Sequence, residues 1–380
     1  GASGSAITWK SDNEAVISTA AQGEKPAGVV NRQDTDTKVK LTATIKMAGG
    51  DRTKDFNVTV KKKASVGAMT DYMFAYFIGN GAGEEQIYFA ASRDGLDWEE
   101  LNEGKPVLES DMGTTGLRDP FILRSPEGDK FYLIATDLCI AKNGSWSEAQ
   151  TNGSQAIMVW ESTDLVNWTK QRMMTISAGI EAGCTWAPEI FYDEATGEYM
   201  VFWASKVKAD NYGKQRLYYC KTRDFYTFTE PKVWIDESHS AIDSTVVRDV
   251  DGTYYRFTKN ESKTFIYMEK SDSLLGNWTM VNSNIASGVE GPCCFAFNED
   301  DVEKAGAKWC LLQDAFGAGG YYPMITDDLS SGKFTKISAN LPSRPRHGTV
   351  MNITEEEYKA LTSKWGKPSL AANSLPTVVE

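Results

Sequence analysis

The phrase Ser92-Arg93-Asp94-Gly95-Leu96-Asp97-Trp98 decides the fold, because related phrases return four more times along the chain. The intervals between them are roughly 50 to 70 residues, enough for one four-stranded unit with its loops. Strand patterns rich in β-branched and aromatic residues fill these intervals. We therefore predict an all-β fold, a five-bladed β-propeller. The later copies occupy residues 162–168, 222–228, 271–278 and 326–334.

The first unit lacks an inner strand, since its strand patterns cover only 72–78, 86–91 and the residues from Trp98 onward. One strand pattern, at 346–353, is left over after the fifth phrase. We predict that this C-terminal strand is the inner strand of the first blade, because closing the ring removes exposed sheet edges. The stretch Thr354-Glu355-Glu356-Glu357 then predicts a capping box for a helix that ends before Gly366.

The composition changes near residue 66. Residues 1–66 hold 11 Lys and Arg against 7 Asp and Glu, whereas the rest of the chain holds 29 against 45. Only Trp9 and Phe56 of the 43 aromatic residues lie in this first part. Its polar and apolar residues alternate as in half-buried strands, and Gly49-Gly50-Asp51 indicates a hairpin.

The pattern around Ile7-Thr8-Trp9-Lys10 and 39–60 resembles a small bacterial immunoglobulin-like domain, although another small β-sandwich also fits it. The resemblance implies a spacer in a protein that is secreted, periplasmic or on the surface of a bacterium. Residues 1–6 lack a basic segment followed by an apolar stretch, so we expect them to be a remnant left after a signal was removed. The expected division is an immunoglobulin-like β-sandwich at 1–66, the propeller at 67–366 and a C-terminal tail at 367–380.

Composition excludes several classes of function. The chain has 40 basic and 52 acidic residues, a net charge of −12, which argues against a nucleic-acid partner and permits a neutral polysaccharide. No apolar run approaches the ~20 residues of a membrane-spanning helix. The six cysteines form no CxxC pair, and His239 and His347 are the only histidines, so a Cys/His zinc site has no ligand set. We expect a monomer with no membrane span.

Acidic residues recur where the innermost strands of the blades begin. Such starts converge on the axis of a propeller, so these side chains are expected to meet although they are far apart in sequence. A cluster of carboxylates has an energetic cost, and glycoside hydrolysis is one reaction that needs it. Four of the five starts carry a carboxylate, in Arg118-Asp119-Pro120, Trp186-Ala187-Pro188-Glu189, Ile242-Asp243-Ser244 and Glu290-Gly291-Pro292, and the fifth, Arg346-His347-Gly348, carries a histidine.

This order of motifs resembles glycoside hydrolase family 43, the five-bladed arabinofuranosidases, xylosidases and arabinanases, over about residues 70 to 353. The resemblance implies that Asp119 is the general base and Glu290 the general acid of an inverting enzyme. Asp243 would be the third carboxylate, which orients the acid and favours its protonated form. The implied activity is that of an α-L-arabinofuranosidase or β-xylosidase that releases terminal arabinose or xylose from arabinoxylan, arabinan or xylan, with no cofactor required for the chemistry.

Other residues near these motifs have weaker assignments. Trp186 is a candidate for stacking on a sugar, or is part of the core. Glu189 and Arg346 are candidates for substrate binding, or for purely internal contacts. Gln313, near the end of a strand in the blade of Glu290, is a candidate for the pocket wall. His347 resembles the family's axial histidine, which implies a structural calcium there or a plain hydrogen-bonding histidine; most of the ligands of such a calcium would be waters.

Three alternative functions remain open at this point. An endo-acting arabinanase or xylanase would have the same fold, and the lengths of loops 137–154 and 204–216 favour a walled pocket and exo action. The related fructan-cleaving enzymes retain configuration and need an Asn-Asp-Pro nucleophile, and nothing like it precedes residue 118. A non-catalytic carbohydrate-binding propeller would lack one of the three carboxylates, and all three are present.

Overall fold

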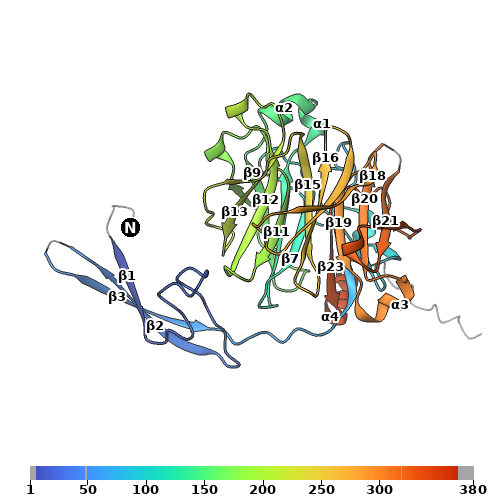
Figure 1. The fold of residues 1–380 in the computed structure, drawn as a ribbon. Coiled ribbons are helices and arrows are strands. Elements are labelled where there is room, and N and C mark those ends of the chain that lie inside the picture. Colours follow the sequence, from blue (N-terminus) through green and yellow to red (C-terminus); the bar gives the residue numbers. More distant parts are fainter. Residues whose placement is uncertain (1–5, 48, 318, 367–380) are drawn as a thin grey trace, which may run out of the picture.

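The structure is a computed structural model that describes residues 6–47, 49–317 and 319–366, and it shows a small N-terminal sheet joined by an extended segment to a β-propeller (Figure 1). The predicted tail at 367–380 lies outside the described residues. The N-terminal sheet is antiparallel, in the order β1-β2-β3, and the Gly49-Gly50-Asp51 turn joins its last two strands. Its strands are β1 (Ile7–Ser11), β2 (Thr37–Ile45) and β3 (Arg52–Val60).

The core of this N-terminal part is small. Val16, Val39 and Val60 form its buried apolar cluster, and Val16 comes from the loop 12–36 that covers one end of the sheet. Among the described residues, the expected sandwich therefore has one regular sheet and an irregular second layer. Trp9 is 47% exposed and packs on Phe56, with ring centres 5.6 Å apart.

Five four-stranded antiparallel sheets follow, and each is one blade of the predicted propeller. In four blades the strands run in sequence order from the innermost to the outermost. These blades are β7 (Leu117–Arg124), β8 (Phe131–Asp137), β9 (Ala156–Ser162) and β10 (Arg172–Thr175); β11 (Trp186–Asp193), β12 (Glu198–Ser205), β13 (Arg216–Thr222) and β14 (Lys232–Ile235); β15 (Ala241–Arg248), β16 (Tyr254–Asn260), β17 (Phe265–Ser271) and β18 (Thr279–Ser287); and β19 (Glu290–Ala296), β20 (Trp309–Ala315), β21 (Gly320–Thr326) and β22 (Thr335–Lys336).

The remaining blade closes the ring as predicted. Its order is β23-β4-β5-β6, so the C-terminal strand pairs with the first strand of the propeller, with Val350 opposite Phe74. The four strands are β23 (Thr349–Thr354), β4 (Met69–Tyr76), β5 (Tyr88–Ser92) and β6 (Trp98–Glu100). Helix α4 (Glu355–Trp365) follows directly, with the capping box of Thr354 and Glu357, and its Leu361 is buried in the core of this blade.

The recurring phrase is the turn between the third and fourth strands of each blade. In the first copy, Asp94 Oδ1 accepts hydrogen bonds from the backbone N–H groups of Leu96 and Asp97, at 2.9 and 2.8 Å. Trp98 Nε1 donates to the carbonyl of Gly95 at 3.0 Å. An Asp at this position satisfies backbone donors that the turn leaves unpaired, and it recurs in four of the five copies; the fourth copy has Ser273 there.

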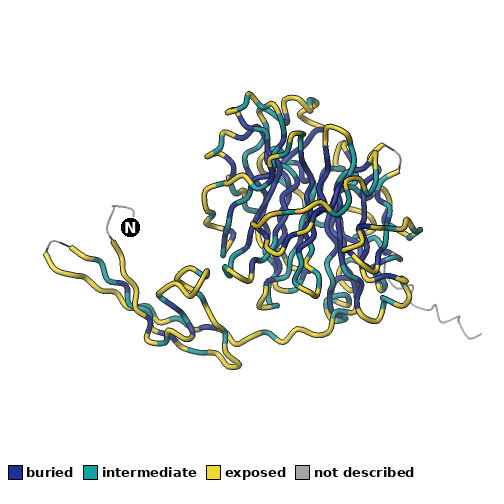
Figure 2. The backbone as a smooth tube through the Cα atoms, in the orientation of Figure 1, coloured by how far each residue is buried: buried dark blue, intermediate teal, exposed yellow. Residues whose placement is uncertain are grey.

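Most of the burial lies inside the blades and between them (Figure 2). All six cysteines are buried and have free thiols. Within the described residues, no helix is both long and apolar enough to cross a bilayer. The other short helices are α1 (Ile140–Asn143), α2 (Trp146–Thr151), α3 (Val302–Ala305), η1 (Asn102–Gly104), η2 (Ala178–Ile180), η3 (Lys208–Asp210), η4 (Glu299–Asp301) and η5 (Leu329–Ser331).

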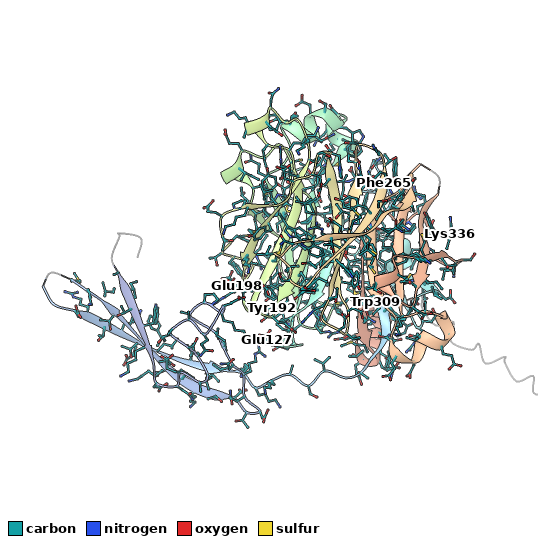
Figure 3. The ribbon with its side chains drawn as sticks, viewed as in Figure 1. Glu127, Tyr192, Glu198, Phe265, Trp309 and Lys336 are labelled. Carbon is teal, nitrogen blue, oxygen red and sulfur yellow. The ribbon has the colours of Figure 1, made fainter. Side chains whose placement is uncertain are left out.

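The N-terminal part touches the propeller through its loop 12–36. Arg32 forms an ion pair with Asp129 at 2.5 Å, and Arg223 donates to the carbonyl of Ala27 at 2.8 Å. Figure 3 labels Glu127 and Tyr192 on this edge of the propeller. In Figure 1 helices α1 and α2 cover the opposite, upper end. The two ends of the propeller are therefore free for different roles.

Candidate active site

The innermost strands begin with the same irregularity in four of the five blades. Asp119, Ala187, Asp243 and Gly291 all have left-handed backbone conformations, with φ between 47 and 52°, and the strand register shifts beside each of them. Such a bulge places two residues of one strand opposite one residue of its partner. At two of the four bulges both successive side chains line the axial cavity: Arg118 with Asp119, and Ile242 with Asp243.

Glycine is required at one of these bulges. A Cβ on Gly291, whose φ is +52°, would lie 2.8 Å from the Cβ and Cγ atoms of His347. In the Glu-Gly-Pro motif, Glu290 thus supplies the carboxylate, and Gly291 leaves room for the side chain of His347.

The converging strand starts enclose a cavity of about 440 Å³ at the end of the propeller that carries α1 and α2. All three predicted catalytic carboxylates, Asp119, Asp243 and Glu290, line it. Buried groups lie toward the axis, whereas the exposed side chains of Asn80, Trp146, Glu261 and Phe316 form its rim. The other lining residues are Phe77, Arg118, Leu138, Gln150, Trp186, Ile242, Arg346 and His347.

Asp119 is held in the ionised form. Its Oδ2 accepts a hydrogen bond from Thr136 Oγ1 at 2.8 Å, and its Oδ1 lies 3.4 Å from His347 Nδ1. Burial alone would raise the pKa of Asp119, but the neighbouring His347, Arg118 and Thr136 lower it below its usual value. A carboxylate that stays ionised can accept a proton from water.

The pKa of Asp243, in contrast to that of Asp119, is raised. Its Oδ2 accepts a hydrogen bond from the backbone N–H of Gly291 at 3.1 Å, which ties it to the strand of Glu290. Burial raises the pKa of Asp243 to about 6, against the lowering effect of His347 and Lys259. The charges of Glu290 and Asp119 add to the rise.

Two cations hold Glu290. Its Oε2 accepts from Lys259 Nζ at 2.7 Å, and its Oε1 accepts from Arg346 Nη2 at 2.9 Å. The side chain of Lys259 is only 3% exposed, and its Nζ also pairs with Glu261 at 2.6 Å. Arg346 in turn donates through Nε to Asp314 Oδ2 at 2.5 Å. Both oxygens of Glu290 are therefore fixed before any substrate binds.

His347 lies at the axis among three carboxylates. Its Nδ1 is 4.0 Å from Asp243 in addition to the contact with Asp119, and its Nε2 is 4.0 Å from Glu189. Burial alone would lower the pKa of His347, but these three neighbours raise it to about 9. The three carboxylates therefore favour the protonated form of the imidazole.

The protein neighbours of His347 would supply few of the ligands of the expected calcium. Within the described part of the chain, no group of three or more His, Cys, Asp or Glu side chains could hold a metal ion. A calcium with six to eight oxygen ligands would therefore need water for most of them, as expected from the sequence, and it stays a prediction.

Two of the expected substrate-binding residues lie away from the cavity. Glu189 does not line it; it is 4% exposed and borders a separate hollow beneath His347, where burial raises the pKa of its carboxyl to about 8. Gln313 is fully buried, with Nε2 donating to Met324 Sδ at 2.8 Å. Because strand residues alternate between faces, it is the next residue, Asp314, that points toward Arg346.

The other two expected substrate-binding residues, Trp186 and Arg346, line the cavity. Trp186 is half-buried in its wall and packs edge to face on Trp146, with ring centres 6.1 Å apart. Arg346 lines the cavity through its contact with Glu290. Trp186 also packs against the apolar cluster under α2, so the two interpretations made from the sequence, cavity wall and core, both describe it.

Sequence reasoning missed the cation that contacts Glu290 most closely. Lys259 is the penultimate residue of β16, a second strand, and no motif marks it. It also missed Glu85, which is buried, pairs with Arg118 at 2.9 Å and accepts the backbone N–H of Ile140 at 2.8 Å. These contacts join blades through side chains, and β16, which also carries Arg256 and Asn260, gave no sequence signal that singles out Lys259.

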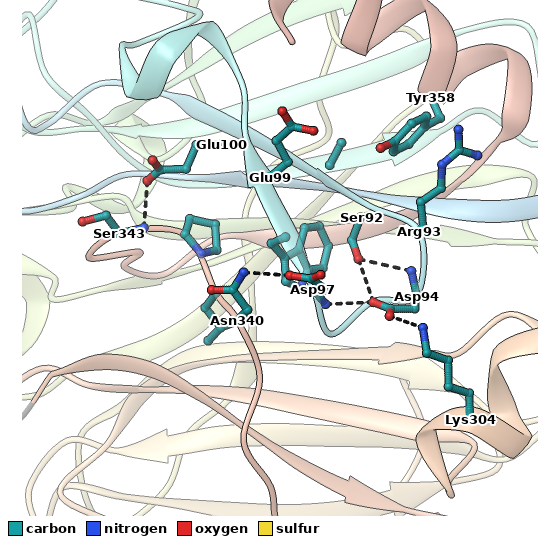
Figure 4. A pocket seen from close by; sticks show the side chains of 14 residues that line it. Ser92, Arg93, Asp94, Asp97, Glu99, Glu100, Lys304, Asn340, Ser343 and Tyr358 are labelled. Carbon is teal, nitrogen blue, oxygen red and sulfur yellow. Dashed lines mark hydrogen bonds and ion pairs between the residues drawn. The ribbon is translucent and has the colours of Figure 1, made fainter. Parts of the chain in front are cut away.

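A larger hollow, of about 620 Å³, lies where the segment before β23 runs along β6 (Figure 4). Two contacts hold its lining together. Lys304 forms an ion pair with Asp94, and Asn340 Nδ2 donates a hydrogen bond to Asp97 Oδ1 at 2.7 Å. The backbone of Asn340 also pairs with Leu96 and Trp98. We call this hollow the closure seam, because it lies where the segment that follows the last blade contacts the first blade.

The fold and the three converging carboxylates define a class, the glycosidase-type β-propellers. Residues 67–359 match the family described as "Probable glycosyl hydrolase domain", which is related to glycoside hydrolase family 43. Residues 1–63 match the family described as "Atrophied bacterial Ig domain". The chain therefore belongs to the family-43-related glycosyl hydrolases, and the predicted family is confirmed.

Relatives support the same placement. Over 99% of its length the chain is 34% identical to an alpha-L-arabinofuranosidase of Bifidobacterium longum subsp. longum, and it covers 43% of that protein. The chain thus spans less than half the length of this relative.

Two solved structures share the fold at low identity. An endo-1,4-beta-xylanase from Bacteroides thetaiotaomicron has a TM-score of 0.50 and 16% identity, over 73% of this chain and 93% of that one. A family-43 beta-1,3-galactosidase has a TM-score of 0.50 and 14% identity, over 72% and 57%. At these identities the likeness concerns the fold alone.

Proposed function

We propose that the chain is an inverting glycoside hydrolase that removes terminal arabinose or xylose from a hemicellulose such as arabinoxylan or arabinan. The observation that carries this proposal is that Asp119, Asp243 and Glu290, from three different blades, line one cavity. The name of the Bifidobacterium relative supports arabinofuranose as the sugar.

In the proposed reaction, Asp119 is the general base. Its ionised carboxylate removes a proton from a water molecule, which attacks the anomeric carbon while the bond to the leaving oxygen breaks. Glu290 is the general acid: in its protonated form it gives its proton to that oxygen, and the carboxylate that remains is stabilised by Lys259 and Arg346. Asp243 holds the backbone N–H of Gly291, and so positions the acid beside it.

The shape of one wall supports exo action. The connection between β8 and β9 folds into α1 and α2 and places Trp146 over the cavity rim. Glu85 fixes this insertion by accepting the backbone N–H groups of Ile140 and Ala141. A wall held in this way favours a pocket for a chain end over a groove for a continuous chain.

The proposed chemistry uses no cofactor. The calcium expected beside His347 stays a prediction. Metal analysis of the purified protein, with His347→Asn as the comparison, checks the point: a stoichiometric calcium lost in the variant would support the site.

The decisive experiment combines a variant with product analysis. Glu290→Gln should reduce hydrolysis of natural arabinosides or xylosides by about 10²–10⁴-fold, and of aryl glycosides with good leaving groups by much less, because a good leaving group needs little protonation. NMR of the first-formed anomer should show inversion.

The matched control is Glu99→Gln in the closure seam, which should leave both substrates unaffected. Equal losses on both substrates would contradict the role of Glu290. A wild-type protein that binds oligosaccharides but hydrolyses nothing on arabinan, arabinoxylan and xylan would support the binding-only alternative. Internal cleavage of linear arabinan or xylan would support endo action.

A further inference from the structure

The leaving-group side of the cavity can be located from Glu290, on the basis of the proposed function. A general acid lies beside the oxygen it protonates, so the sugar attached to that oxygen lies on the same side. Residues that surround Glu290 at the open rim are therefore the ones that meet the leaving sugar.

Lys259 identifies these rim residues. Its Nζ lies 2.7 Å from Glu290 Oε2, 2.6 Å from Glu261 Oε2 and 5.1 Å from the ring centre of Phe316. Glu261 follows β16 and Phe316 follows β20, so two neighbouring blades contribute the turns that meet around one ammonium group. Both side chains are exposed and line the cavity.

Phe316 is unusual in its exposure. Its side chain is 45% exposed, and it is the only phenylalanine among the exposed large apolar residues of the described chain. A single exposed apolar side chain is ordinary on a protein surface. Here, however, the exposed ring borders a cavity with buried carboxylates, and Glu261 offers an acceptor beside it.

A sugar presents two kinds of surface, an apolar C–H face and an edge of hydroxyl donors. An exposed aromatic ring fits the first, and a carboxylate fits the second. Trp146, the other exposed aromatic of the rim, lies instead beside Arg118, at 5.3 Å from its guanidinium carbon, and so on the side of Asp119.

We propose that Phe316 and Glu261 form a binding subsite for the sugar residue on the leaving-group side of the scissile bond. Phe316 supplies the surface on which the sugar packs, and Glu261 accepts a hydroxyl hydrogen. Lys259 connects this subsite to the acid, because it contacts all three side chains.

The test compares two substrates with Phe316→Ala. One is an arabino- or xylo-oligosaccharide, whose leaving group is a sugar; the other is the matching glycosyl fluoride, whose leaving group is one atom and cannot reach Phe316. The ratio of kcat/KM for the oligosaccharide to kcat/KM for the fluoride should fall about five- to ten-fold, mainly through KM. Phe316→Tyr, which keeps the ring, should retain the ratio.

Trp9→Ala is the matched control, since Trp9 is an aromatic of similar exposure, 47%, in the N-terminal part. It should leave the ratio unchanged. If the wild type hydrolyses both substrates but Phe316→Ala leaves their ratio unchanged, the subsite is overturned while the proposed function stands. If the wild type hydrolyses neither, the proposed function is overturned and the subsite with it.

Discussion

The axial cavity and the closure seam are both lined by acidic side chains, and the seam is the larger hollow, at about 620 against 440 Å³. In the seam, Asp94 is paired with Lys304 and Asp97 is exposed to solvent. At the axis, Asp243 and His347 are buried and their pKa values are raised by burial or by neighbouring charges. The volume of a hollow therefore does not identify the functional site, whereas buried charges that lie close together do.

The backbone differs between the two regions in the same way. Asp119 and Asp243 both have positive φ values, which are unfavourable for residues with a side chain and cost on the order of 1–3 kcal/mol each. In the seam the corresponding left-handed position is Gly95, where this conformation is free of strain. The axial strands thus retain strained aspartates where a glycine would be more stable.

The largest effect is expected from Asp119→Asn. The amide keeps the shape of the side chain and can still contact Thr136, but it cannot take a proton from water. We expect kcat to fall by about 10²–10⁴-fold. Steady-state kinetics on an arabinofuranoside or xyloside measures this, and Asp97→Asn in the seam is the control, with an expected change of less than about two-fold. Comparable losses in both variants would abolish the distinction between the regions.

A smaller effect is expected from Asp314→Asn, on the pH dependence of stability. Burial raises the pKa of Asp314 to about 6, although Arg346 opposes the rise. The folded protein therefore binds a proton more tightly than the unfolded chain, so this contribution to stability is present below about pH 4 and is lost as the pH rises through 6. Between pH 4 and 7 the free energy of unfolding of the wild type should fall by on the order of 2 kcal/mol more than that of the variant.

Urea unfolding at several pH values measures this difference, with Asp97→Asn as the seam control. A variant that loses as much stability as the wild type over the same interval would show that Asp314 is not the group responsible.

Lys259→Met should reduce kcat/KM by about ten-fold, because Glu290 loses one of its two donors. Lys304→Met is the matched control, since Lys304 pairs with Asp94 in the seam. We expect it to leave kcat/KM unchanged, and Lys259→Arg to recover part of the loss. Full activity in Lys259→Met would mean that Arg346 alone orients the acid.

The smallest effect is expected in the seam. Asn340→Ala removes the hydrogen bond to Asp97 and should lower the free energy of unfolding by about 0.5–1.5 kcal/mol, with no change in kcat. Thermal unfolding and a standard assay check the two parts separately. A loss of activity without a loss of stability would place the seam in function after all.

Much of the fold could be predicted because it follows from local sequence patterns. The phrase around Asp94 repeats since every blade needs the same turn, and the unpaired strand at 346–353 had one available partner. The carboxylates Asp119, Asp243 and Glu290 could be located because each begins an innermost strand. The predicted roles of these residues remain proposals that the variants above test.

The sequence by itself determined the number of blades, the closure of the ring and the acidic residues that converge at its axis, because these follow from repeats, alternation and the position of each strand start. Only the tertiary structure decided which neighbours those carboxylates have. Lys259 contacts Glu290 from another blade, Glu189 lies beneath His347, and Asp314 instead of Gln313 faces Arg346. Such contacts depend on the bulges and on which face each side chain takes, and neither leaves a periodic signal in the sequence.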